Sequence, residues 1–206
     1  MLKKYIKYII LSQFIFVYTQ CLASPVSARV GVKAGLNHCV RKANGFQSHT
    51  GKGFHAGIDI GFDLFPCFAI DITPQIKSSH YKSPMWPGTD YEYMNVYIPT
   101  VVSLKLLSAP SLSPYLGIGG AVNFQLSGKM INRDDGNNGE QKIEALENDV
   151  YFVAVCGIEA KLARLRISPE LSFNYNLTPD YPGSEELSIS HYDVHFSVGL
   201  CYSFDL

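Results

Sequence analysis

The sequence predicts an all-β chain: an eight-stranded antiparallel up-and-down transmembrane β-barrel, preceded by a cleaved signal peptide. Three observations predict this fold. Apolar and polar residues alternate with period two in eight segments, whereas no segment has the amphipathic pattern of a helix. Glycine and charges of both signs share the polar face of these segments. Short and long connections alternate between the segments, which is typical of outer-membrane barrels.

The start of the chain has the pattern of a secretory signal peptide. Three lysines within the first seven residues precede an apolar run at 9–18, and Cys21–Ala23 is a small-x-small cleavage site. We therefore expect a signal peptide at 1–23 and an outer-membrane barrel domain at 24–206. A retained helical anchor is the alternative, but the apolar run is short for a membrane span of about 20 residues.

Charge and hydropathy exclude two classes of protein. The leader holds three of the 17 basic residues and none of the 18 acidic ones, so the remaining chain has a net charge of −4. Phosphate binding needs a basic patch, and we therefore expect no nucleic-acid partner. The remaining chain has no apolar run of helical spanning length, so a membrane location requires a barrel.

The first four segments each have one apolar face. Residues 28–37 set valine, alanine and leucine against arginine, lysine and glycine, and residues 53–65 set large apolar side chains against histidine, aspartate and glycine. Residues 68–77 follow a short Phe-Pro-Cys turn and alternate isoleucine with polar residues. Residues 95–106 set valine, isoleucine and leucine against asparagine, tyrosine, serine and lysine. Each pattern is that of a strand with two different faces.

The last four segments complete the predicted barrel. Residues 114–128 follow a turn rich in serine and proline, and their polar face carries glycine, asparagine and glutamine. Residues 149–162 are more apolar on both faces, although glycine, glutamate and lysine mark the polar one. Residues 164–177 and 191–204 alternate almost without exception. The connections after the first, third, fifth and seventh segments are long and polar: 38–52, 78–93, 129–148 and 178–187. We expect them to form four external loops.

The composition of the polar face indicates that it lines the lumen. Glycine in a strand marks a close approach or a bend, and an eight-stranded barrel has little internal room. Opposite charges can pair in such a lumen, where an unpaired charge would be costly. The apolar face, with aromatic residues near the segment ends, would then contact lipid. The predicted lumen charge network consists of Arg29, Lys33, Asp59, Asp63, Asp71, Lys105, Glu159, Arg166, Glu170 and Asp193.

The order of the strings "VGVKAGLN", "GFHAGIDIGFDL", "YIPTVVSLKL" and "PYLGIGG" resembles the outer-membrane β-barrel domain family common in Bacteroidetes, which includes PorT-like proteins. The resemblance covers about 29–204, and its most specific pieces are Ile98–Pro99 and Pro114–Gly120. It implies an eight-stranded barrel in the outer membrane of a Gram-negative bacterium, but no single activity. Barrels of this kind usually end on an aromatic residue that the insertion machinery recognises, whereas here Asp205–Leu206 follow Phe204.

One constellation of the polar face suggests a metal. His191, Asp193 and His195 share the inward face of the last segment. His55 and Asp59 share the inward face of the second segment, which lies two strands away across the first segment. Imidazole and carboxylate groups bind zinc and similar ions. The alternative is a hydrogen-bonded polar lumen, which the lack of any known ligand spacing favours. We therefore expect no metal and no cofactor.

The sequence motifs give little support for an enzymatic function. Serine and histidine occur together near the last segment, as in enzymes that trim or acylate lipids, but no G-x-S-x-G motif is present. We expect no catalytic residues, and a lipid-modifying enzyme remains an alternative.

We expect the four cysteines after the leader to lie at different levels along the barrel axis. We place Cys39 in the first loop, Cys67 in a turn at the opposite end, Cys156 toward lipid and Cys201 toward the lumen. A disulfide needs Cα atoms within about 7 Å, so we expect mostly free thiols.

The second long loop carries large apolar side chains. Tyr81, Met85 and Trp86 could form an exposed recognition patch, and the alternative is a loop that rests on the barrel rim.

We therefore expect a non-enzymatic outer-membrane protein with a side-chain-filled lumen, because a barrel of this size has no wide channel. Its role would be structural, or it would bind a ligand or partner protein through the four external loops. Outer-membrane lipid and the barrel-insertion machinery are its other expected partners. One alternative is a narrow porin-like pore for small solutes. Another is a soluble, secreted lipocalin-like barrel whose apolar face lines a ligand cavity.

Overall fold

The computed structural model describes most of the predicted barrel domain. The described residues are 26–43, 49–65, 67–82, 88–106, 111–132, 139–143, 148–178 and 189–205. The predicted signal peptide at 1–23 lies outside them. Within these ranges, no helix is long and apolar enough to cross a membrane.

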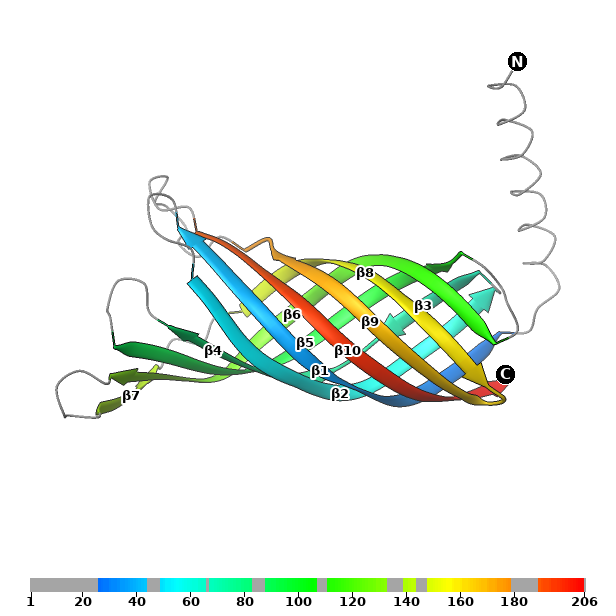
Figure 1. The fold of residues 1–206 in the computed structure, drawn as a ribbon, viewed down its shortest axis with the longest axis horizontal. Coiled ribbons are helices and arrows are strands. Elements are labelled where there is room, and N and C mark those ends of the chain that lie inside the picture. The colour runs from blue at the N-terminus through cyan, green and yellow to red at the C-terminus, as the bar shows by residue number, and fades with distance from the viewer. Residues whose placement is uncertain are drawn as a thin grey trace, which may run out of the picture.

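Antiparallel strands close into a ring of eight (Figure 1), which confirms the predicted eight-stranded antiparallel barrel. Pairing of β1 with both β2 and β10 closes the ring, and β3 and β4 together form one interrupted ring strand. A tenth element, β7, pairs with the end of β6. The strands are β1 (Ser27–Ala43), β2 (His49–Phe65), β3 (Phe68–Ile72), β4 (Gln75–Lys82), β5 (Thr89–Lys105), β6 (Leu112–Asn132), β7 (Gly139–Ile143), β8 (Asn148–Leu162), β9 (Leu165–Asn176) and β10 (Ile189–Asp205).

The interruption between β3 and β4 falls at Thr73 and Pro74. Proline has no N–H to donate to a strand ladder, so the regular pairing stops there. The flanking strands bridge the gap, because the Thr73 N–H donates to the Pro99 carbonyl at 3.1 Å and the Ile58 N–H donates to the Pro74 carbonyl at 3.0 Å. The inward face continues through the gap, with Ala69 and Gln75 both buried.

The apolar face of the ring points outward. Val32 on β1 is 59% exposed and Ile118 on β6 is 63% exposed, whereas the charged side chains of the alternate positions are buried. This orientation contradicts the lipocalin-like alternative, in which the apolar face would line an internal cavity. Among the thiols, Cys156 is exposed and Cys201 is buried, and none of the four cysteines of the described residues forms a disulfide.

Several strands extend into the predicted loops. β1 continues to Ala43, so Cys39 lies in a strand and is fully buried, contrary to its predicted place in a loop. β7 lies within the predicted loop 129–148. At the long-loop end, part of the sheet extends past the rest of the ring (Figure 1). It consists of Thr89–Met94 of β5, Ser127–Asn132 of β6 and β7, with the end of β4 paired beside β5, and we call it the projecting sheet.

A register shift marks the base of the projecting sheet. Met94 pairs with Ser127 and Asn95 pairs with Gln125, so Leu126 has no partner on β5. An extra residue on one strand bends the strand and increases its twist. The shift therefore lies where β5 and β6 leave the ring.

Candidate functional site

The lumen near the short turns is filled by ion pairs, and we call this group the ionic layer. Its side chains come from inward positions of β1, β2, β3, β5, β8 and β9. They are Arg29, Lys33, Asp59, Asp63, Asp71, Lys105, Glu159, Lys161, Arg166 and Glu170.

Two carboxylates form the centre of the ionic layer. Asp63 accepts hydrogen bonds from Arg29 at 3.2 Å, from Lys105 at 2.9 Å and from Arg166. Glu159 lies 3.1 Å from Arg29, 3.1 Å from Lys105 and 3.2 Å from Arg166. The same three cations thus bridge both carboxylates, which ties β1, β5 and β9 to β2 and β8 across the lumen.

Two further carboxylates, Glu170 and Asp59, lie beside Lys33. The Lys33 ammonium is 3.2 Å from Glu170, which also accepts a hydrogen bond from the Tyr115 hydroxyl at 2.9 Å. Asp59 lies 4.0 Å from Lys33 and accepts a hydrogen bond from Thr73 at 3.0 Å. The layer holds five cations and five carboxylates, so its charges balance, as buried charges require.

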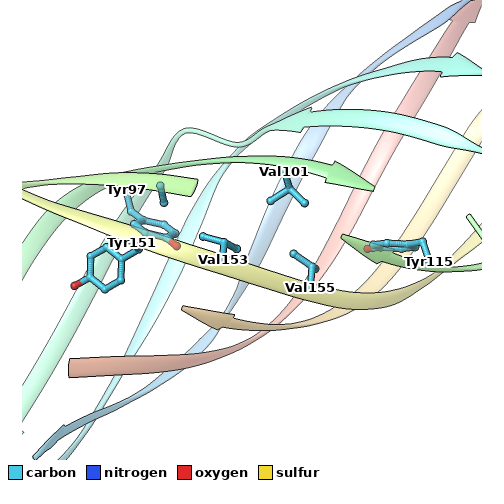
Figure 2. Packing of buried hydrophobic residues seen from close by; sticks show 7 residues of the cluster. Tyr97, Val101, Tyr115, Tyr151, Val153 and Val155 are labelled. Carbon is cyan, nitrogen blue, oxygen red and sulfur yellow. The ribbon is translucent and has the colours of Figure 1, made fainter. Parts of the chain in front are cut away.

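An apolar row lies against the inner wall formed by β5, β6 and β8. Figure 2 shows Val153 and Val155 between the Tyr97–Tyr151 pair and Tyr115, with Val101 facing them. The Tyr97 and Tyr151 rings meet edge to face, with centroids 5.9 Å apart. This row explains why β8 is apolar on both faces: its inner face packs against other lumen side chains instead of ions.

A second polar group lies at the long-loop end, and we call it the outer cluster. Its members are Cys39, Lys77, Tyr81, Tyr151, His191 and Asp193. The Lys77 ammonium pairs with the Asp193 carboxylate, and both side chains are inaccessible to solvent. Lys77 also lies over the Tyr97 and Tyr151 rings, 5.2 Å and 5.5 Å from their centroids. The outer cluster therefore keeps one cation and one anion paired in a dry site.

The structure divides the ten residues of the predicted charge network. Nine of them meet in the ionic layer, whereas Asp193 lies in the outer cluster with Lys77. Lys77 alternates with the outward apolar residues of its strand, so it was expected to point inward, but it was not assigned to the charge network. The sequence carries no signal for this pairing, because partners across a lumen depend on how far the strands are staggered.

Four of the five residues considered for zinc binding lie close together, whereas Asp59 belongs to the ionic layer. His55 and His195 stack with ring centroids 4.8 Å apart, and His195 Nε2 lies 3.8 Å from Asp193 Oδ2. His191 and Asp193 do meet, with Nε2 and Oδ1 3.0 Å apart, and Cys39 joins them. Cys39 was not among the predicted candidates because its sequence position was expected to lie in a loop.

The predicted recognition patch also needs a correction. Tyr81 lies on β4 with its side chain buried, and its hydroxyl is 3.3 Å from His191 Nε2. It faces the lumen because β4 extends further than predicted. Met85 and Trp86 lie outside the described residues.

Two internal cavities are too small to form a channel. One, of about 20 Å³, is lined by ionic-layer residues such as Lys33 and Glu170. The other, also of about 20 Å³, is lined by residues that include His55, Tyr97 and Val153. Such a volume holds about one water molecule. Side chains therefore fill the lumen at both levels.

Comparisons with known proteins agree on the fold. No known protein family matches the chain, and no curated protein does. A major outer membrane protein of Thermus thermophilus superposes with a TM-score of 0.52 and 16% identity, over 86% of this chain and 99% of that one. Neisserial surface protein A superposes with a TM-score of 0.50 and 16% identity, over 85% and 97%. The chain therefore has the fold of small outer-membrane β-barrels.

Proposed function

We propose that this chain is a protein of the Gram-negative outer membrane that binds an external partner through the projecting sheet. The outward apolar face supports the location, because soluble proteins rarely expose large contiguous apolar surfaces. The fold it shares with outer-membrane proteins of Thermus and Neisseria supports it as well.

The observation that carries the binding role is the contrast between the two ends of the molecule. The lumen is packed with paired charges and aromatic rings, which argues against a solute pore. A pore would require the Arg29, Lys105 and Arg166 cations to leave Asp63 and Glu159 together, which exposes five charges at once. The projecting sheet, in contrast, carries backbone and side chains beyond the ring.

β7 offers the surface that a partner can use. Among the described strands it pairs with β6 alone, so no described strand covers its other edge. Glu140, Gln141 and Lys142 on this strand are exposed. An extended segment of another protein can add to such an edge as a further strand, and charges on the edge limit indiscriminate pairing. The proposed partner is therefore an extended protein segment.

A photo-crosslinking amino acid at Gln141 tests this function on intact cells. We expect protein adducts at Gln141, and we expect a Gln141→Pro change in β7 to abolish adduct formation at a neighbouring position, Lys142. The same probe at Ile118 is the control, because that outward position should yield only lipid adducts. Absence of protein adducts at Gln141, together with steady ion conductance in planar bilayers, would favour the pore instead.

We also propose that the chain is related to the PorT-like barrels of Bacteroidetes and that the insertion machinery recognises β10. The motif order around Ile98–Pro99 and Pro114–Gly120 supports the relationship. Phe204 is exposed on the outer face near the end of β10, where the machinery would contact it. Deletion of Asp205–Leu206 should then preserve or improve assembly, whereas Phe204→Ala should impair it.

A further inference from the structure

The outer cluster brings three metal-ligating side chains together from two neighbouring strands. Cys39 on β1 pairs in register with Asp193 on β10, and His191 precedes Asp193 by one inward position. Their Sγ, imidazole nitrogen and carboxylate oxygen all lie within 4.8 Å of one another, and all three residues are buried. One ion can therefore contact all three donors with small side-chain adjustments.

The surrounding contacts orient each donor. In the metal-free site His191 Nε2–H donates to Asp193 Oδ1 at 3.0 Å, because a carboxylate only accepts, and Nδ1 lies 3.3 Å from the Tyr151 hydroxyl. When an ion binds, the ring proton moves to Nδ1, where the Tyr151 hydroxyl accepts it, and Nε2 becomes free to bind the ion. Lys77 holds the other carboxylate oxygen, Oδ2. Outer partners of this kind fix the tautomer and ring orientation of metal-bound histidines.

The thiol is oriented in the same manner. The Asn37 side-chain amide donates a hydrogen bond to Cys39 Sγ at 3.3 Å, and the Ser79 hydroxyl lies 3.8 Å from the same sulfur. These contacts orient the sulfur, and metal binding displaces the thiol proton, because the thiolate is the form that binds metals. The other lumen thiol, Cys201, donates to the Asp59 carboxylate at 3.2 Å and lies at the ionic-layer end of the lumen.

We propose that Cys39, His191 and Asp193 form a binding site for a soft monovalent cation, Cu(I). Thiolate and imidazole ligands suit copper, and thiolate selects its monovalent state. On binding, the Cys39 S–H bond breaks, the proton passes to water and an S–Cu bond forms, with copper remaining Cu(I). Neutral His191 contributes Nε2, so sulfur and imidazole nitrogen hold the ion, and the Asp193 carboxylate beside them balances the charge of Lys77.

Charge balance distinguishes Cu(I) from a divalent ion at this site. The Lys77 ammonium and the Asp193 carboxylate cancel, and the Cys39 thiol is neutral. Exchange of the thiol proton for Cu(I) keeps the site neutral. Zn²⁺ in the same place would leave a net positive charge among buried groups, which is costly. The site lies toward the long-loop end, near the ends of β1 and β10, so the ion would enter from that mouth.

The test uses the folded barrel in detergent, in a background where Cys21, Cys67 and Cys156 are alanine. This background leaves the two lumen thiols, Cys39 and Cys201. Cu(I) is supplied as its bicinchoninate complex in oxygen-free buffer, and transfer is followed by loss of the complex's colour. We expect uptake of one Cu(I) per chain with release of one proton, and no displacement by equimolar Zn²⁺.

Matched variants assign the ligands. Cys39→Ser should abolish uptake and His191→Gln should weaken it at least tenfold, whereas Cys201→Ser should bind as the background does. A gel-mobility shift on heating verifies that each variant is folded. If Cys39→Ser does not fold, X-ray absorption at the copper edge of the background protein decides, with one sulfur and at least one imidazole ligand expected. Uptake that survives Cys39→Ser, loss on Cys201→Ser, tighter binding of Zn²⁺, no uptake by the folded background, or a copper spectrum without imidazole would overturn the proposal.

Discussion

Lys77 of β4 and Asp193 of β10 form an ion pair that solvent does not reach, with side-chain exposures of 1% and 0%. The two residues are separated by 116 positions in the chain, and the pair spans the lumen across β1 and β2. The lumen is therefore a packed interior. It holds this ion pair, the aromatic rings beneath the Lys77 ammonium, and the ionic layer nearer the short turns.

Lys77→Met should destabilise the barrel strongly, because it leaves the Asp193 charge buried without its partner. Breaking a buried ion pair from one side typically costs about 3–5 kcal/mol. The double variant Lys77→Met with Asp193→Leu should lose much less, since no charge then remains unpaired. Urea unfolding of the detergent-refolded barrel, followed by tryptophan fluorescence, measures both. Equal losses in the single and double variants would show that the pair is not buried as described.

Glu170→Leu should lower stability through the ionic layer. The change removes the acceptor of both the Lys33 ammonium and the Tyr115 hydroxyl. An unsatisfied buried partner costs about 1–3 kcal/mol, and more when the partner is charged. Glu140→Leu on exposed β7 is the control, because its contact with Lys129 at 3.5 Å is a surface ion pair of about 0–1 kcal/mol. The temperature at which the folded gel band disappears gives the comparison, and similar shifts for both variants would argue against a packed lumen.

Gly119→Ala should destabilise the barrel, whereas Gly120→Ala should be nearly neutral. A Cβ at Gly119 points inward and would overlap the backbone carbonyl of Thr100 on β5, but at Gly120 the nearest atom is the Tyr151 carbonyl oxygen at 3.6 Å. Overpacking of this kind costs about 1–3 kcal/mol. The adjacent pair controls for any general effect of losing a glycine from β6. Urea midpoints measure the difference, and an equal or larger loss at Gly120 would contradict the assigned faces.

Val32→Arg should impair membrane assembly, because Val32 lies on the outward apolar face between the exposed side chains of Ile58 and Leu200. A lipid-facing arginine at the bilayer midplane costs about 2–4 kcal/mol, and about 0–1 kcal/mol near the interfaces. His38→Arg is the matched control, since His38 lies on the same strand and face, closer to the long-loop end. Folding yield in lipid vesicles measures both, and equal yields would argue that Val32 does not face lipid.

The faces of the strands could be predicted from the sequence, because period-two alternation assigns every residue to one side or the other. Arg29 and Val32 illustrate this: one is buried in the ionic layer and the other lies on the outer surface. The inward glycines were attributed to a narrow lumen. At Gly119 the reason is more specific, since a side chain there would meet the neighbouring backbone.

The candidate metal site could not be predicted, because it depends on strand length and stagger. A polar sequence such as the one after Leu36 fits a loop as well as a strand that rises above the membrane, and Cys39 was placed accordingly. Its register opposite Asp193 follows from the closure of β1 on β10, which joins residues 154 positions apart and has no local signal. The Lys77–Asp193 pair could not be predicted for the same reason.

The mobility of the mature protein on a denaturing gel, boiled and unboiled, tests the membrane barrel most simply. The protein is taken from the outer-membrane fraction of producing cells. A closed barrel of paired strands should resist the detergent until it is boiled, so we expect two bands of different mobility and retention in the detergent phase. A single band, with the protein recovered in the soluble periplasmic fraction, would contradict the outward apolar face and the membrane location that follows from it.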